Sequence, residues 1–503
     1  MKKRLVAFLL LVVMMVSACA GLTACGTPDD GKLHISFYHT MGQNLRDVLD
    51  RYIAQFEALY PQYKIDHQQI GSYDDVRDQI ATEITVGNQP NIAYCYPDHV
   101  ALYNLAYAVK TLDEFIDSTE VIERADGTTE ILGLTEEQKA DFIQAYYEEG
   151  RQFGDDLMYT MPLSKSTEVL YYNKTFFDAC KAIYDAEFIK DANGNNVANP
   201  NYHNEIYNLK VPTTWDEMEE TCAKIIAIEN AKLSDADKAA GKKANVIPLG
   251  YDSESNWFIT MCEQLKSGYT TLEGDEKFIF DNETNRKFVE RFREWYTKGY
   301  VTTQEIHGSY TSSLFVEQGA GKTKSYMSIG SSAGATHQRP TADANGKYPF
   351  EVGIAPIPQA DATNPKVISQ GPSLCIFEDS AEEMKASWLF VKFLCTNIGF
   401  QADFSIASGY VPVIKSVDTD ELYAEHLESA DGGDNIAALS VKVCLAQEAY
   451  YYTSPAFNGS SAARDEVGAL LQKCLLIKNV ADVPAEIKKA FAEAIANCKY
   501  KAD

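Results

Sequence analysis

Residues 33–38 read Leu-His-Ile-Ser-Phe-Tyr, an alternation of apolar and polar side chains that predicts a strand. Apolar residues at helical spacing follow between Leu45 and Leu59, and this predicted helix stops at Pro61. The pattern then recurs as a second strand at 63–68, a second helix from Asp74 to Thr85 and a third strand at 91–96. Strand, helix, strand, helix, strand predicts a parallel sheet with crossover helices, and therefore an α/β fold.

The carboxyl ends of these predicted strands carry aromatic and polar side chains. Tyr38 and His39 end the first strand, Tyr73 follows the second, and Asp98 follows the third. Ligands of open α/β sheets bind beyond these ends. A tyrosine ring stacks on the C–H face of a sugar, while polar groups hydrogen-bond its hydroxyls. The pattern favours a sugar site, with the filling of half-buried surface as the alternative for any single tyrosine.

The first 25 residues predict export. A basic start, Met1-Lys-Lys-Arg4, precedes an apolar run from Leu5 to Val16, which is typical of a secretory signal peptide and is shorter than a membrane span of about 20 residues. Leu22-Thr-Ala-Cys-Gly26 resembles a bacterial lipobox, which makes Cys25 the predicted lipid attachment site and residues 26–32 a tether. We expect a bacterial lipoprotein anchored at the extracellular face of the cytoplasmic membrane. Cys19 is the alternative lipid site, and an ordinary cleaved signal peptide is the alternative to lipidation.

Composition limits the class of protein and its partners. About 480 residues follow Cys25, too many for one core, so two or more lobes are expected. The net charge of −27, without a basic patch, argues against binding to nucleic acid or to anionic membrane surfaces. The cysteines after Cys25 are odd in number and widely spaced, and most have apolar neighbours. They are interpreted as small buried side chains, not as disulfides or metal ligands.

The sequence contains no recognisable catalytic motif. GxSxG, HExxH, P-loop and GxGxxG patterns are missing, and the eight histidines are scattered. We therefore predict no catalytic residue, no cofactor and no metal site. Acidic residues are so numerous that a glycosidase pair could be named anywhere, so a secreted carbohydrate-active hydrolase stays open as an alternative of another class.

A series of motifs, in a consistent order, extends over nearly the whole chain from Ile35. They are Phe37-Tyr-His-Thr-Met41, Gly71-Ser-Tyr-Asp-Asp-Val76, Gly87-Asn-Gln-Pro-Asn-Ile-Ala93, Met161-Pro-Leu-Ser-Lys-Ser-Thr-Glu-Val-Leu-Tyr-Tyr-Asn-Lys174, Val211-Pro-Thr-Thr-Trp-Asp-Glu217, Met327-Ser-Ile-Gly-Ser-Ser332, Gly353-Ile-Ala-Pro-Ile-Pro358, Trp388-Leu-Phe-Val-Lys-Phe-Leu394 and Ala407-Ser-Gly-Tyr-Val-Pro-Val413. On these motifs the sequence resembles the extracellular solute-binding proteins of ABC importers, in the carbohydrate-type family 1 that includes maltose-binding and glycerol-3-phosphate-binding proteins.

The resemblance implies a two-lobed periplasmic-binding-protein fold of type II, with several strands crossing at a hinge. The N-terminal lobe would comprise residues 33–158 and 364–410, and the C-terminal lobe residues 159–363 and 411–503. The hinge would lie near Met161-Pro162 and Val367-Ile368. The ligand would bind in the cleft of a monomer, and the lobes would close over it before docking on the ABC permease.

The resemblance also implies most of the ligand-binding residues. Matched by motif, they are Tyr73, Asp98, Ser166, Ser331, Ser332, Gly371 and Tyr410, with Trp257 as an aromatic of the second lobe. Tyr38 and His39 join them from the end of the first strand. The alternative for each of these residues is a structural hydroxyl, ring or turn.

One departure from the family pattern bears on the ligand. Glycerol-3-phosphate-binding members carry a phosphate-holding arginine in the C-terminal segment, whereas the matching position here is Phe457, with Arg464 a turn or two further on. A missing arginine argues against a phosphorylated ligand. We therefore predict a sugar or oligosaccharide, with glycerol-3-phosphate or a glycerophosphodiester as the alternative ligand. A surface adhesin or signalling receptor built on the same fold is a further alternative.

Overall fold

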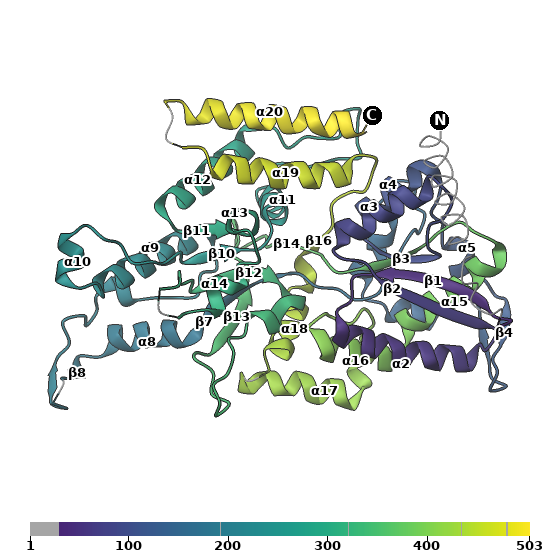
Figure 1. Cartoon of the computed structure of the whole chain (residues 1–503), viewed down its shortest axis with the longest axis horizontal. Helices are drawn as coiled ribbons and strands as arrows, with labels where there is room; N and C mark the ends of the chain where they lie inside the picture. The colour runs from purple at the N-terminus through teal and green to yellow at the C-terminus, as the bar shows by residue number, and fades with distance from the viewer. Residues whose placement is uncertain (1–29, 192, 320, 434, 479–480, 503) are drawn as a thin grey trace, which may run out of the picture.

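The computed structural model describes residues 30–191, 193–319, 321–433, 435–478 and 481–502. The predicted signal peptide, both candidate lipid-attachment cysteines and the first part of the predicted tether lie outside these residues. The chain forms two lobes side by side, each built around a five-stranded sheet (Figure 1). The predicted α/β fold is confirmed.

The elements of the first lobe come from two separate parts of the chain. They are β1 (Leu33–His39), α2 (Gln43–Leu59), β2 (Tyr63–Gln69), α3 (Tyr73–Ile84), β3 (Ile92–Cys95), α4 (Pro97–Tyr103), η1 (Asn104–Ala106), α5 (Asp113–Ile116), β4 (Val121–Glu123), β5 (Thr129–Ile131), α6 (Glu136–Asp141), α7 (Gln144–Tyr147), η2 (Glu148–Arg151), β6 (Met161–Pro162), β15 (Ser373–Ile376), α15 (Ala381–Thr396) and α16 (Ile398–Ser408).

The first sheet has the strand order β2-β1-β3-β15-β6. Strands β2, β1 and β3 are parallel, as the βαβαβ pattern predicts, and β15 joins antiparallel to both β3 and β6. Helix α3 begins at a capping box in which Ser72 and Asp75 satisfy each other's backbone N–H groups. This cap fixes where the chain turns after β2, at the edge of the sheet where a ligand is expected.

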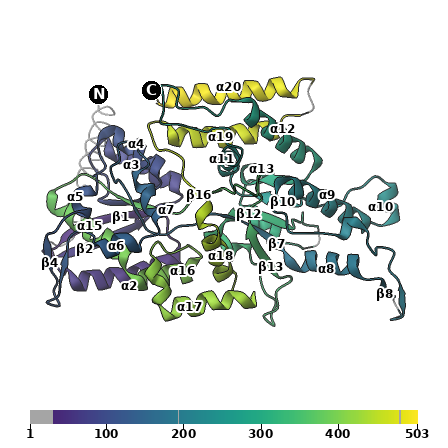
Figure 2. The same cartoon turned by 180° about the vertical axis from the view of Figure 1, so that it is seen from behind.

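The second lobe holds most of the remaining elements. They are β7 (Glu168–Asn173), α8 (Lys174–Asp185), β8 (Phe188–Lys190), β9 (Asn196–Ala198), η3 (Glu205–Tyr207), α9 (Trp215–Ala231), α10 (Asp235–Ala239), β10 (Leu249–Tyr251), α11 (Glu254–Gln264), α12 (Glu283–Lys298), β11 (Val301–Thr303), α13 (Gln304–His307), α14 (Ser312–Val316), β12 (Met327–Ser331), η4 (Ser332–Gln338), β13 (Val352–Pro356), β14 (Val367–Ile368), η7 (Glu448–Tyr450), β16 (Tyr451–Tyr452), α19 (Ser460–Leu475) and α20 (Val483–Ala502). Between the lobes lie η5 (Lys415–Thr419), α17 (Glu421–Glu428), η6 (Ser429–Gly432) and α18 (Ile436–Ala446) (Figure 2).

The second sheet has the order β11-β10-β12-β7-β13. Strand β10 is parallel to β11 and β12, and β7 is antiparallel to β12 and β13. Helices α19 and α20 stack above this sheet, and α19 reaches the α4 side of the first lobe (Figure 1). Helix α19, near the C-terminal end of the chain, therefore contacts both lobes.

The observed pairing shifts the predicted lobe boundaries in three places. Met161–Pro162 was assigned to the second lobe, but it pairs with β15 at the edge of the first sheet. The chain directly after α16 is predicted in the second lobe, yet Ile414 pairs with Phe142 and the Val413 carbonyl accepts from the Ile143 N–H, both in the first lobe. Helix α18, further on, packs mainly on η4 and β13 of the second lobe. Conversely, Val367–Ile368 pairs with Tyr451–Tyr452 and packs in the second core.

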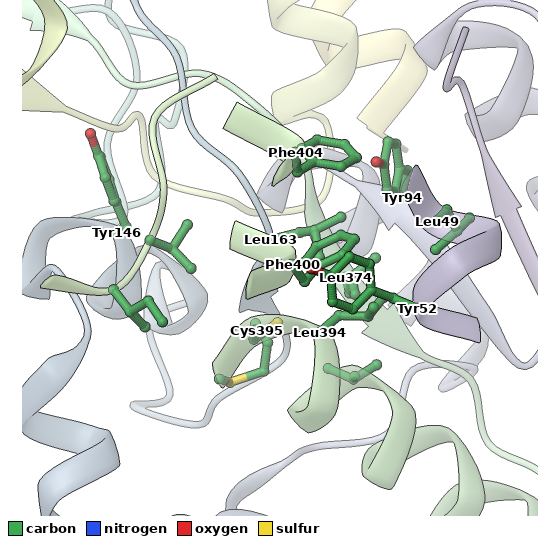
Figure 3. Packing of buried hydrophobic residues seen from close by; sticks show 14 of the residues in the cluster. Leu49, Tyr52, Tyr94, Tyr146, Leu163, Leu374, Leu394, Cys395, Phe400 and Phe404 are labelled. Atoms are coloured by element: carbon green, nitrogen blue, oxygen red, sulfur yellow. The ribbon is translucent and has the colours of Figure 1, made fainter. Parts of the chain in front are cut away.

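The first core forms where α2 and α16 pack together. Tyr52 of α2 meets Phe400 of α16 edge to face with ring centroids 5.4 Å apart, and its hydroxyl donates to Asp403 at 2.9 Å. Figure 3 shows these rings with Leu374 of β15 and Leu394 and Cys395 of α15. Every cysteine that the structure describes is buried and free, which confirms the interpretation of these residues as small core side chains. Among the described residues, no helix is both long and apolar enough to span a membrane.

Candidate ligand-binding site

A cleft with an empty volume of about 540 Å³, its open mouth included, lies between the two lobes. Both lobes and the segment after β14 line it. The lining residues are Tyr96, Pro97, Asp98, Glu149, Ile259, Tyr269, Ile368, Ser369, Gln370, Thr453, Ser454, Pro455, Ser460 and Arg464. Asp98 stands in the first turn of α4, directly beyond the carboxyl end of β3. The cleft thus lies at the sheet edge where the sequence predicts a ligand.

Arg464 projects from the second turn of α19. This helix begins at Ser460 because Gly459, at φ +96°, turns the chain, while the Ser460 hydroxyl donates to the carbonyl of Phe457 at 2.8 Å. Burial alone would lower the pKa of Arg464, but the charge of Asp98 and the nearby tyrosine hydroxyls outweigh it and raise this pKa. Arg464 is therefore a fixed positive charge in the cleft.

A buried network holds the arginine in place. The Arg464 guanidinium donates to the side-chain oxygen of Asn256, and the Asn256 amide donates to Glu168 Oε1 at 3.1 Å. The Tyr251 hydroxyl donates to Glu168 Oε2 at 2.6 Å. Burial raises the pKa of Glu168 to about 7, although these two hydrogen bonds and the charge of Arg464 oppose the rise. Because Glu168 fixes the Asn256 amide, Asn256 presents its oxygen, not its NH₂ group, to Arg464.

Tyr269 adds an unsatisfied hydroxyl to the wall of the cleft. Its side chain is 8% exposed and its ring stacks on Phe280 with centroids 6.1 Å apart. No group in the described part of the chain hydrogen-bonds the hydroxyl. Leaving such a buried group unpaired costs about 1–3 kcal/mol, which a polar ligand would recover. This hydroxyl is therefore suited to a ligand that offers hydrogen-bonding groups of its own.

Several predicted site residues gather at or beside the cleft. Asp98 lines it directly. The hydroxyls of Tyr73 and Tyr410 lie 3.3 Å apart, and the Tyr73 ring lies 4.8 Å from that of Tyr96, which does line the cleft. The structure thus brings together tyrosines that are more than 300 positions apart in the sequence.

Two predicted serines also meet, from different strands. Ser166 precedes β7, and Ser331 ends β12; their hydroxyl oxygens are 3.4 Å apart. The Ser331 hydroxyl also accepts a hydrogen bond from the backbone N–H of Ala333 at 3.3 Å. Neither serine belongs to the lining of the cleft, so both remain predictions as ligand contacts.

Trp257, Ser332 and Gly371 have structural environments. Trp257 is fully buried, and its ring stacks 3.9 Å from that of Phe292 in the second core. The hydroxyl of Ser332, also fully buried, accepts from the Thr167 N–H at 3.2 Å. Gly371 has φ +95°, and a Cβ there would lie 2.5 Å from the Ser164 carbonyl oxygen, so close packing of two segments requires a glycine. None of the three lines the cleft in this structure.

Tyr38 and His39 at the end of β1 also face protein. Tyr38 is half-buried and packs against the cluster that contains Val76 and Ile80 of α3. Burial and the Glu83 carboxylate of α3 raise its pKa. His39 is fully buried; its Nε2 lies 2.8 Å from Nδ1 of His67, and its Nδ1 accepts from the Met41 N–H at 3.1 Å. Successive side chains of a strand point to opposite faces of the sheet. Tyr38 and His39 therefore point to the two faces of the sheet, and neither points beyond the carboxyl end of β1, where the ligand is expected.

Arg464, Tyr269 and Glu149 are cleft residues that the sequence analysis did not assign as ligand contacts. Arg464 could have been found, because it is the only arginine after Arg339 and stands in the segment where the family places one. Phe457, which the motif count matched instead, packs against Phe278 with centroids 5.7 Å apart. Tyr269 and Glu149 lie in stretches without a local motif, so only the fold reveals them. The described residues contain no cluster of His, Cys, Asp and Glu that could hold a metal ion.

Comparisons with known proteins show the family and the fold of the chain. The family described as bacterial extracellular solute-binding protein matches residues 51–429. The sn-glycerol-3-phosphate-binding periplasmic protein UgpB of Escherichia coli K12 is 25% identical over 193 residues, which are 38% of this chain and only 35% of that protein.

Two solved structures share the fold over most of the chain. UgpB from Mycobacterium tuberculosis in complex with glycerophosphocholine superposes with a TM-score of 0.66 at 16% identity, covering 94% of this chain and 98% of that one. Maltose-bound MalE3 from T. maritima gives 0.62 at 16% identity, with coverage of 92% and 99%. With three quarters of the chain matched by one family and the two-lobed fold reproduced, this chain belongs to the bacterial extracellular solute-binding proteins.

Proposed function

We propose that the chain is the substrate-binding lipoprotein of a bacterial ABC importer. It captures a sugar or oligosaccharide between its lobes and delivers it to the membrane permease without changing it chemically. The observation that carries the proposal is the cleft itself, since groups from both lobes line one cavity. A ligand that touches both lobes favours the closed arrangement by its differential affinity for that state. The motif around Cys25 supports attachment by lipid at the extracellular face of the membrane, with the chain acting as a monomer.

The chemistry of the cleft supports a neutral, hydroxyl-rich ligand. Asp98 and Glu149 accept hydrogen bonds, Arg464 donates them, and the Tyr269 hydroxyl can do either. Tyrosine rings beside these groups offer flat apolar faces, as the C–H face of a sugar requires. Hydrogen-bond acceptors and donors that lie side by side in this way suit sugar hydroxyls, which both donate and accept.

A phosphorylated ligand is the second candidate, and Arg464 is the observation that favours it. A guanidinium binds phosphate through two parallel hydrogen bonds. One relative is named as a glycerol-3-phosphate-binding protein. Another was solved in complex with glycerophosphocholine. Against it, Asp98 and Glu149 line the same cleft and would repel a phosphate. We therefore place a sugar first and a glycerophosphodiester second.

Calorimetric titration of residues 26–503 tests both candidates. The panel comprises glucose, galactose, mannose, maltose, maltotriose, glycerol, glycerol-3-phosphate and glycerophosphocholine. We expect one ligand per chain, a sugar as the tightest, and no reducing sugar released over hours. At a ligand concentration of 100 times Kd, binding adds about 2.7 kcal/mol to the free energy of unfolding, visible as a higher Tm. Binding of none of these compounds would contradict the proposal, and sustained sugar release would indicate a hydrolase instead.

A further inference from the structure

A buried ion pair lies at the floor of the cleft. Lys165 Nζ is 2.7 Å from Glu149 Oε2, and the two side chains are 0% and 2% exposed. The ammonium also donates to Ser373 Oγ at 3.1 Å and contacts the Gly371 carbonyl oxygen at 3.4 Å. Its three hydrogens thus have three acceptors, which is the condition under which a buried charge is tolerated.

The pair lies where the chain passes between the lobes. Lys165 lies in the segment between β6 and β7, whereas Gly371 and Ser373 follow β14 on the way into the first sheet. The Lys165 backbone also exchanges hydrogen bonds with Val411, which follows α16: Lys165 N–H donates at 2.9 Å, and its carbonyl accepts at 2.6 Å. Lys165 therefore links its own segment, 163–167, to two others, 369–373 and 409–412, and we call the three the connecting segments.

The carboxylate of Glu149 has unused hydrogen-bonding capacity. Oε2 accepts from Lys165 and from Ser369 Oγ at 3.3 Å. An ionised carboxylate accepts about four hydrogen bonds. Among the described residues, the hydrogen bonds that the Glu149 carboxylate accepts all end on Oε2, so Oε1 has capacity to accept others. Glu149 and Ser369 both line the cleft, so the free accepting capacity is available on the ligand's side.

We propose that Glu149 is a ligand-contacting, specificity-determining residue whose Oε1 accepts a hydrogen bond from a ligand hydroxyl, while Lys165 holds the carboxylate in place. This inference rests on the proposed solute-binding function and narrows it. A carboxylate that only accepts selects a donor, so it favours a hydroxyl-bearing part of the ligand and disfavours a phosphate at the same position. Because Lys165 joins the three connecting segments, the proposed contact with Glu149 also places ligand recognition beside the segments that link the lobes.

The first test compares two matched substitutions in residues 26–503. Glu149→Asp keeps the charge beside Lys165 but withdraws the carboxylate by one methylene group. Glu148→Asp makes the same change on the exposed neighbouring residue. With the tightest ligand of the panel above, we expect Glu149→Asp to raise Kd at least tenfold and Glu148→Asp to leave it within twofold. An unchanged Kd in a folded Glu149→Asp protein would overturn the inference.

The second test needs no mutant and remains informative if Glu149→Asp fails to fold. Deoxy and deoxyfluoro analogues of the tightest panel ligand are titrated into the wild-type chain, one hydroxyl position at a time. Because Glu149 can only accept, fluorine cannot replace the hydroxyl it contacts. At one position we expect both analogues to bind at least tenfold more weakly than the parent ligand. If the fluoro analogue binds like the parent at every position, the inference is wrong.

A double variant separates a ligand contact from a purely structural role. Glu149→Met/Lys165→Met removes both charges and the accepting oxygens at position 149, and it leaves no unpaired ion. We expect the penalty for the critical deoxy analogue, measured against the parent, to fall below twofold in this variant. A penalty equal to that of the wild type would overturn the inference. If the wild type binds no compound of the panel, it is the proposed function that fails, so the two failures are distinguishable.

Discussion

Arg464 and its partners show how a single side chain is positioned for binding. The guanidinium is held by Asn256, and Asn256 is held by Glu168, all within a buried chain of hydrogen bonds. Each member comes from a different element, α19, α11 and β7. The arginine therefore faces the cleft with a fixed orientation, which reduces the entropy that a ligand must remove on binding.

Arg464→Gln should weaken binding of the tightest ligand by about 1.5–3 kcal/mol, because hydrogen bonds to charged groups are worth about this much. Calorimetry against the panel measures the change. Arg286→Gln, whose parent side chain pairs with Asp281 on the second lobe, is the control and should bind like the wild type. If Arg464 binds a phosphate, the loss will be larger for glycerol-3-phosphate than for any sugar. Equal affinities in both variants would remove Arg464 from the site.

His39 makes stability depend on pH. Burial, with the nearby His67 and Arg46, lowers the pKa of His39 to about 3, whereas an unfolded histidine titrates near 6.5. Between these values the unfolded state binds more protons, so the free energy of unfolding decreases as pH falls below about 6.5. The slope from this group is at most about 1.4 kcal/mol per pH unit, and above pH 6.5 its contribution is constant.

Urea unfolding of the wild type and of His39→Gln between pH 4 and pH 8 measures this dependence. The variant should be less stable at pH 8 but should show a shallower decline below pH 6.5. His203→Gln removes an exposed imidazole and serves as the control, with the wild-type slope. A His39→Gln slope as steep as that of the wild type would show that other groups produce the decline.

At the scale of elements, α3 of the first lobe meets α19 of the second at the rim of the cleft. Arg77 of α3 donates to Ser461 Oγ at 3.2 Å and lies 3.4 Å from Asp465 Oδ2, both on α19. It also pairs within its own lobe with Asp74 and Asp78. Only the contacts to α19 are lost when the lobes separate, so they favour the closed arrangement.

Arg77→Gln should raise the Kd of the tightest ligand by about two- to fivefold, since a partly exposed ion pair contributes about 0.2–1 kcal/mol. The dissociation rate should increase by the same factor, because the contact acts on the closed state. Arg51→Gln, which breaks the exposed pair with Asp403 inside the first lobe, is the matched control. Stopped-flow or surface-based kinetics measure both rates, and an effect on association alone would contradict this role.

The elements also show how far sequence analysis could reach. The run β1-α2-β2-α3-β3 was predictable because each element has a local sequence pattern. The patterns are apolar–polar alternation in the strands, helical spacing of apolar residues, and a capping box at the start of α3. The insertion of β15 between β3 and β6 was not, since strands of four and two residues pair across more than 200 positions. The site divided in the same way. Asp98 follows directly from the end of a strand, whereas Arg464 and Glu149 enter the cleft only through long-range packing.

At the scale of the whole molecule, the buried cysteines are distributed over both cores, so their reactivity measures how well each core is closed to solvent. Those in the first core and its flank are Cys95, Cys375, Cys395 and Cys444, and those in the second are Cys180, Cys222, Cys262, Cys474 and Cys498. All nine are buried and free. Burial raises the pKa of Cys222 and Cys395 and raises that of Cys180 to about 11, which suppresses the reactive thiolate.

We therefore expect these thiols to react only slowly with Ellman's reagent in the native chain 26–503. All nine should react in 6 M guanidinium chloride without added reductant. Ligand should slow labelling of cysteines in both lobes to the same degree, because binding stabilises the assembled molecule. Mass spectrometry of the labelled peptides gives the rate at each position. Rapid native labelling at any of them, or fewer than nine reactive thiols after denaturation, would contradict the structure.

The order of strands in the first sheet has a consequence for biosynthesis. Strand β15, which joins β3 to β6, is translated only after the whole second sheet, since it ends at Ile376 whereas β13 ends at Pro356. While the ribosome adds those residues, the edge of β3 stays unpaired and β6 has no neighbour to bind. Such an edge invites pairing with other chains. The first sheet can therefore close only after about three quarters of the chain, up to Ile376, has emerged.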